Sequence, residues 1–161
     1  MAETEAPRVP PVRLTDDIAA AVNGAATRGV PLAVAYVDGN GLPHLSIRGT
    51  VQVHGDDELA LWARSAGMPD AVRVNPNVAL LYQDLANHTF YQFTGRAHVD
   101  DDPAIRDAVF ENSPEREQAQ DPQRSGAAIV VALDAVRGRG PSGLVQMARP
   151  QRGWRTDTRQ T

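Results

Sequence analysis

Short apolar runs separated by turn signals dominate this 161-residue chain and restrict the folds open to it. Strand-like runs cover residues 30–37, 44–53, 59–63, 78–82, 89–99, 127–136 and 144–148. Short turns join most consecutive runs, so neighbouring strands are expected to pair antiparallel. The chain is therefore predicted to be mainly β, a six- to seven-stranded antiparallel barrel with two or three peripheral helices.

Helices are expected where capping residues precede a helical period. Thr15, followed by two aspartates, is predicted to cap the first helix. The pairs at 102–103 and 113–114, each a capping residue followed by proline, predict two further short helices. Residues 64–74 are polar and helical in character and end at the Asn-Pro pair at 75–76.

The length suits a single domain, since domains usually run roughly 100–200 residues. Residues 1–13 contain three prolines and no apolar period, which predicts an extended arm. Residues 14–148 are expected to form the globular domain. Residues 149–161 are rich in arginine and are expected to form a basic, disordered tail.

Composition excludes several kinds of chemistry. Cysteine is absent, which rules out disulfides, thiolate catalysis and cysteine-bound metal centres. All 16 basic residues are arginine, so neither a lysine Schiff base nor a lysine-containing phosphate loop is possible. The net charge of -4 and the mixed charge pattern argue against nucleic acid as a partner. No apolar run approaches the roughly 18 residues of a membrane span, so a cytoplasmic protein without membrane contact is expected.

The histidines and serines do not form a familiar catalytic or metal-binding motif. His44, His54, His88 and His98 have none of the usual metal-ligand spacings, so no metal site is predicted. A haem ligand stays open, because one histidine suffices for that role. No Gly-x-Ser-x-Gly motif supports a serine hydrolase.

Five strings follow one another in a characteristic order and spacing. They are GLPHLSIRG at 41–49, LALWARS at 59–65, NPNVALLY at 75–82, FTGRA at 93–97, which leads into DDP at 101–103, and the apolar run at 127–136. In this order the chain resembles the pyridoxamine 5'-phosphate oxidase-like superfamily, the FMN-binding split β-barrels. The resemblance spans about residues 14–148. It implies an antiparallel split β-barrel that forms a homodimer, with two flavin sites at the interface between the subunits.

The resemblance also implies which residues bind the cofactor. They are Ser46, Ile47, Arg48, Gly49, Trp62, Ala63, Arg64, Ser65 and Met68. The planar guanidinium of Arg48 suits a phosphate and lies on the same polar strand face as Ser46. Arg64 and Ser65 add a second cation and a hydroxyl group, and Trp62 is expected to pack against the edge of the flavin ring.

The segment before the Asn-Pro pair departs from the family pattern. Family members commonly carry a basic pair there that clamps the phosphate, whereas residues 66–70 read AGMPD and contain no cation. Either Arg64 or Arg73 replaces that pair, or a different ligand binds, or flavin binds weakly. The superfamily also contains users of a deazaflavin cofactor, haem-binding members and members without demonstrated activity.

The expected function is that of an FMN-binding oxidoreductase that transfers a hydride between flavin and a small substrate. A deazaflavin-dependent reductase is the alternative, and a non-catalytic dimeric binding or stress protein without cofactor is a third. No catalytic residue is assigned. His44, Tyr82 and Tyr91 are acid-base candidates near the expected site, although each also suits a structural role.

Overall fold

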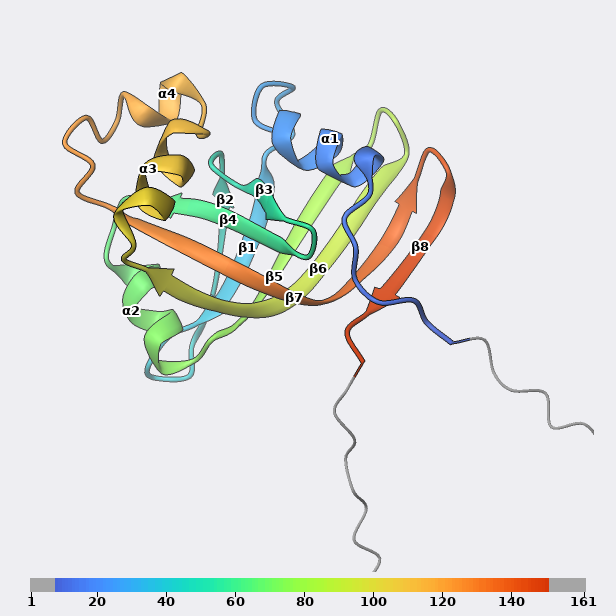
Figure 1. Ribbon diagram of the computed structural model, residues 1–161, viewed down its shortest axis with the longest axis horizontal. Helices are drawn as coiled ribbons and strands as arrows, with labels where there is room; N and C mark the ends of the chain where they lie inside the picture. The colour runs from blue at the N-terminus through green and yellow to red at the C-terminus, as the bar shows by residue number, and fades with distance from the viewer. Residues whose placement is uncertain (1–7, 151–161) are drawn as a thin grey trace, which may run out of the picture.

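The computed structural model describes residues 8–150, which form a curled antiparallel sheet with helices around its rim (Figure 1). The strands are β1 (Leu32–Val37), β2 (Pro43–Arg48), β3 (Gln52–Gly55), β4 (Glu58–Ala63), β5 (Asn77–Asp84), β6 (Thr89–Asp100), β7 (Ala127–Gly140) and β8 (Gly143–Ala148). The helices are α1 (Asp16–Gly24), α2 (Gly67–Val74), α3 (Pro103–Glu111) and α4 (Glu115–Gln118). The predicted β-barrel class with peripheral helices is confirmed.

The strand order explains why the sheet closes on itself. The order is β2-β1-β5-β6-β7-β4-β3, and β8 also pairs with β7. β2 and β3 stand at opposite ends of this order, yet only residues 49–51 join them, so the sheet must curl until its two ends meet. Thr50 fastens the junction: its hydroxyl donates to the carbonyl of Trp62 at 3.0 Å and accepts from the N–H of Trp62 at 3.1 Å. Beyond that point β2 pairs only with β1, so the barrel is split along the free edge of β2.

The segment expected as one strand over residues 44–53 is two strands. Polar and apolar residues alternate through it, but the hydroxyl of Thr50 makes the contacts to β4 that a continued strand would make with its backbone. At Gly49 a Cβ would lie 2.7 Å from a carboxylate oxygen of Glu117, so α4 packs directly on the strand break. This break raises the strand count to eight, and residues 64–74 contribute a regular helix, α2, to a total of four within residues 8–150.

The helix starts predicted at Thr15 and Asp102 are confirmed by their caps. At 113–114 a helix forms, but Pro114 makes no side-chain cap hydrogen bond and the Ser113 hydroxyl donates instead to the carbonyl of Val109 at 2.8 Å. The Thr15 hydroxyl accepts the N–H of Ile18 at 3.4 Å at the start of α1. The Asp102 carboxylate accepts the N–H groups of Ala104 and Ile105 at 2.8 and 3.3 Å at the start of α3. α1 covers one end of the barrel and buries Ile18 against the core.

The core has two parts. The main part fills the barrel, and alternate residues of β6, among them Tyr91, Phe93 and Ala97, point into it as the sequence pattern predicts. The smaller part lies between α3 and the outer surface of β4 and β7. It consists of Ala60, Trp62, Val109, Phe110, Ala128 and Val130.

The two ends of the chain extend beyond the structure. Residues 1–7 of the expected arm and residues 151–161 of the expected tail lie outside the described residues. Arg149, assigned to the tail from sequence, is fixed to the barrel: its guanidinium donates to the carbonyl of Leu133 at 3.3 Å and to the Asp57 carboxylate at 3.2 Å. Across residues 8–150, no helix has the length and apolar character needed to span a membrane.

Candidate cofactor site

The free edge of β2 presents a polar face beside the split. His44, Ser46 and Arg48 alternate along it, in register with the inward-facing residues of β1. The Nε of Arg48 donates to the Ser46 hydroxyl at 2.9 Å, which holds the guanidinium along the strand. Within residues 8–150 Arg48 has no ion pair with a carboxylate. Its positive charge is therefore available to a ligand.

A second arginine lies at the end of β4, across the split. β3 pairs with β4 in a register that places Gln52 opposite Ala60, and the contact of Thr50 with Trp62 continues that register. Arg48 and Arg64 each lie two residues from this contact, Arg48 at the end of β2 and Arg64 just after β4. Arg64 donates a hydrogen bond to the neutral side chain of Gln120, and among the described residues it too lacks an ion pair with a carboxylate. The fold thus brings together the two segments that the resemblance predicts.

The start of α2 lies beside β1. The Tyr36 hydroxyl lies 3.6 Å from the position that a Cβ of Gly67 would take, so Tyr36 reaches from β1 to the first residue of α2. Ser65 is exposed before the helix, whereas the side chain of Met68 is fully buried in the core. Met68, a predicted cofactor-binding residue, therefore presents only its backbone at the start of α2, because its side chain fills the barrel.

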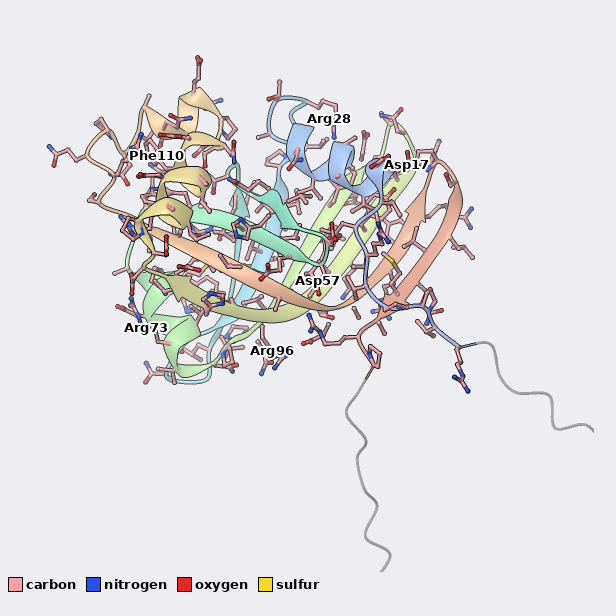
Figure 2. The ribbon with its side chains drawn as sticks, in the orientation of Figure 1. Asp17, Arg28, Asp57, Arg73, Arg96 and Phe110 are labelled. Atoms are coloured by element: carbon pink, nitrogen blue, oxygen red, sulfur yellow. The ribbon has the colours of Figure 1, made fainter. Side chains whose placement is uncertain are left out.

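Trp62 also differs from expectation, because its ring faces α3 rather than the cleft. Its side chain is only 3% exposed and packs edge-on against Phe110 (Figure 2), with ring centroids 5.2 Å apart. The Arg106 guanidinium lies over the indole at 5.0 Å from the ring centroid. The indole is thus enclosed and does not lie against a ligand in the cleft. Ala63, another predicted contact, is also buried.

Asp121 completes the surroundings of Trp62. One carboxylate oxygen accepts the Trp62 indole N–H and the Gly126 N–H, both at 2.9 Å. The other accepts the Ser125 N–H at 3.0 Å and the Ser125 hydroxyl at 2.9 Å. Burial alone would raise the pKa of Asp121, but these hydrogen bonds outweigh burial and lower its pKa to about 2.

We expect Asp121 to make the fold sensitive to strong acid. Because the pKa of Asp121 is lower in the folded than in the unfolded chain, its ionisation stabilises the fold above about pH 4. This stabilisation, of order 1–2 kcal/mol, is lost as the pH falls towards 2. Urea titrations at pH 5 and pH 2.5 measure it. An Asp121→Asn variant should lose less stability over this interval than the unmodified protein, and an equal loss would contradict the assignment.

Of the three acid-base candidates, only His44 lies at the cleft. Tyr82 and Tyr91 are buried in the barrel, and burial raises the pKa of Tyr91. The side chain of His44 is 45% exposed, and its Nε2 lies 2.8 Å from Asp38 Oδ2. This hydrogen bond is the main reason that the pKa of Asp38 lies below its usual value. Sequence reasoning did not identify the pair, although the turn expected at residues 38–41 places both residues at one hairpin end.

A groove adjoins the cleft between α1 and α4. It has a volume of about 480 Å³, and its lining includes Thr27, Ile47, Gly49, Arg116 and Glu117. Two of these residues, Ile47 and Gly49, belong to the predicted cofactor segment. Within residues 8–150, no cluster of three or more histidine, aspartate or glutamate side chains is arranged to hold a metal ion.

Comparison with solved structures places this fold among known proteins. HupZ of Group A Streptococcus matches with a TM-score of 0.61 and 16% identity, over 81% of this chain and 98% of HupZ. A Clostridium acetobutylicum protein related to general stress protein 26 of B. subtilis, of the pyridoxinephosphate oxidase family, matches with a TM-score of 0.58 and 12% identity, over 83% and 96% of the two chains. An FMN-binding protein from Syntrophomonas wolfei matches with a TM-score of 0.52 and 7% identity, over 74% and 84%.

These likenesses confirm the resemblance at the level of the fold. The chain has the split β-barrel fold of the pyridoxamine 5'-phosphate oxidase-like superfamily. No protein-family model and no curated protein matches its sequence. At such low identity the activity has to be argued from the chain's own residues.

Proposed function

We propose that this protein binds FMN in the cleft beside β2 and acts as a flavin-dependent oxidoreductase on a small substrate. The observation that carries the proposal is the presence of two arginines, Arg48 and Arg64, each two residues from the Thr50–Trp62 contact and each without a carboxylate partner within residues 8–150. A phosphate monoester is the ligand that such a pair of guanidinium groups binds best. The FMN-binding protein with the same fold supports this choice of ligand.

The residues present fit the cofactor. Arg48 and Arg64 would bind the phosphate, with hydroxyl groups from Ser46 and the exposed Ser65. The groove beside Gly49 would offer space for the remainder of the molecule. When bound, FMN supplies hydride transfer through its isoalloxazine ring, while the chain's own residues bind it, orient it and exclude water. Glu117, which lies against Gly49 and lines the same groove, is a carboxylate close to the proposed site.

We further propose that two copies of the chain associate through the outer face of the sheet. Two adjacent rows of side chains cross β2, β1, β5 and β6 on this face. They are Leu45, Ala35, Ala79 and Thr94 in one row, and Ile47, Ala33, Leu81 and Gln92 in the next. We call these eight residues the apolar sheet face. None is charged, and Leu45 and Ile47 are 75% and 65% exposed.

The apolar sheet face suits contact with a second copy of the chain. An uncharged, largely apolar surface is self-complementary, which a two-fold symmetric contact requires. The face also includes Leu45 and Ile47 of β2, whose opposite side carries Ser46 and Arg48. A partner that covers this face would therefore lie next to the proposed cofactor site.

The lack of a cation at the start of α2 favours a second candidate, a deazaflavin-dependent reductase. Gly67 and the buried Met68 leave this helix start with backbone groups alone to contact an anion. Parallel titrations with FMN and with a deazaflavin cofactor separate the two proposals by the tighter ligand. Failure of both to bind would favour a non-catalytic protein that shares the fold.

The expected effect of Arg48→Ala is a roughly ten- to hundredfold weaker affinity for FMN, because a charge-assisted hydrogen bond to phosphate is lost. Quenching of flavin fluorescence measures the dissociation constant. Arg64→Ala should have a similar effect. Arg73→Ala is the matched control, because Arg73 is exposed on α2 and already paired with Asp70 at 3.3 Å (Figure 2). Equal affinities for the Arg48 and Arg73 variants would place the phosphate elsewhere.

A further inference from the structure

The Asp38–His44 pair is held in a fixed geometry at the tip of the β1–β2 hairpin. Asp38 Oδ1 accepts the N–H groups of Asn40 and Leu42 at 2.9 and 3.0 Å, which leaves Oδ2 to contact His44. The imidazole lies flat on the Tyr36 ring, with centroids 4.9 Å apart and an angle of 2° between the planes. The carboxylate and the imidazole are therefore both oriented by the hairpin itself.

The pair lies at one end of the polar face that carries Ser46 and Arg48. Residues two apart on one strand face are separated by about 7 Å, so His44 is within electrostatic range of an anion bound at Ser46. The second ring nitrogen, Nδ1, has no hydrogen-bond partner within residues 8–150. The contacts with Tyr36 and Asp38 fix the plane of the imidazole ring, and the His44 side chain is partly exposed, so Nδ1 is left to solvent.

We propose that the Asp38–His44 pair makes anion binding in this cleft dependent on pH. With His44 protonated the pair is neutral, whereas with a neutral imidazole the pair carries the full negative charge of Asp38 and repels a phosphate. The proposal rests on the proposed function in one respect, because it takes the bound anion to be the phosphate of FMN. It adds a regulation of that site by proton concentration.

Charged side chains near the polar face of β2 include Arg48, Arg64 and Glu117, and at the start of α2 Asp70 is paired with Arg73. Arginine and acidic side chains do not ordinarily change charge between pH 5 and 8, whereas histidine ordinarily does. The proposal therefore assigns the change of charge to the Asp38–His44 pair.

The first test compares FMN affinities at pH 5.5 and pH 8.5 for the unmodified protein, His44→Gln and Asp38→Asn. The FMN phosphate itself titrates near pH 6, so each variant is compared with the unmodified protein at the same pH. At pH 5.5 His44→Gln should bind FMN about three- to sevenfold more weakly, and at pH 8.5 equally well. At pH 8.5 Asp38→Asn should bind about three- to sevenfold more tightly. A His44→Gln effect that is the same at both pH values overturns the proposal.

The second test does not depend on flavin. The His44 C2–H resonance is followed by NMR from pH 5 to 8.5, with and without inorganic sulfate, whose charge is constant over this range. An anion in the cleft should raise the titration midpoint of His44, because binding and protonation favour each other reciprocally. His98 is the internal control: its Nε2 lies 3.5 Å from Asp100 Oδ2, on the side of the sheet away from the cleft. An unshifted His44 midpoint, or equal shifts of both, contradicts the proposal.

The two tests separate the failure of this inference from failure of the proposed function. If FMN does not bind but sulfate shifts the His44 midpoint, the flavin proposal fails and the pH-dependent anion site stands. The opposite outcome is that FMN binds both the unmodified protein and the His44→Gln variant, with a ratio of their dissociation constants that does not change with pH. In that case FMN binding stands and the role of the Asp38–His44 pair is overturned.

Discussion

Replacing Asp121 by alanine is expected to lower the free energy of unfolding by about 3–5 kcal/mol. The reason lies in the donors that the substitution leaves behind: the Trp62 indole N–H, the N–H groups of Ser125 and Gly126, and the Ser125 hydroxyl would all lose their acceptor. The side chain is only 6% exposed, so water does not readily replace it. Urea denaturation followed by tryptophan fluorescence measures the change.

Asp107→Ala is the matched control for this prediction. Asp107 is an exposed carboxylate that pairs with Arg124 at 3.0 Å, and its loss should cost less than about 1 kcal/mol. If Asp121→Ala does not fold, Trp62→Phe removes one of the donors and should give a smaller but measurable loss. Equal stabilities for the Asp121 and Asp107 variants would mean that the Asp121 network contributes little.

Leu81→Arg is expected to disrupt the dimer that we propose. Leu81 lies within the apolar sheet face and is already 39% exposed in the single chain, so the fold tolerates a longer polar side chain there. In a symmetric dimer the substitution buries two unpaired charges, each at a cost of several kcal/mol. The dissociation constant of the dimer should therefore rise at least about a thousandfold. Light scattering coupled to gel filtration, over a range of concentrations, measures it.

Leu144→Arg provides the control for the same substitution at another exposed leucine. Leu144 is 78% exposed in β8, outside the apolar sheet face, and its replacement should leave the dimer intact. If the two subunits share the cofactor site, Leu81→Arg should also weaken FMN binding, whereas Leu144→Arg should not. A monomeric mass for the unmodified protein at micromolar concentration would overturn the dimer proposal.

The parts of the fold that were predictable from sequence are those set by local signals. The residues of β6 alternate between barrel and solvent, and the caps at Thr15 and Asp102 are residues whose side chains bond to the next backbone N–H groups. The break between β2 and β3 was not predictable in this way. It depends on contacts from distant segments, namely Thr50 with Trp62 and Gly49 with Glu117.

The residues of the candidate site divide in the same way into those that could be predicted from the sequence and those that could not. Arg48, Ser46 and Arg64 were identified from their order along the chain, and the contact of Thr50 with Trp62 brings the ends of their two segments together. The orientation of the Trp62 side chain could not be predicted from the sequence. β4 is buried on both faces, so its polar and apolar residues do not alternate in a way that would show which side faces α3. The exposure of Leu45 and Ile47 could not be predicted either. In a sequence, an apolar residue that contacts a partner subunit cannot be distinguished from one that fills a core.

The position of β7 in the sheet has a consequence for the synthesis of this protein. β7 pairs with β6 along most of its length, with β4 through its first half and with β8 through its second half. After β4 has been synthesised, residues 64–126 must still be made before its partner strand begins, which takes roughly 3 to 13 s at common translation rates. During that interval Leu59, Leu61 and Trp62 have no strand of β7 to pack beside. The nascent chain is therefore exposed to aggregation for seconds, at the point where chaperones would bind it.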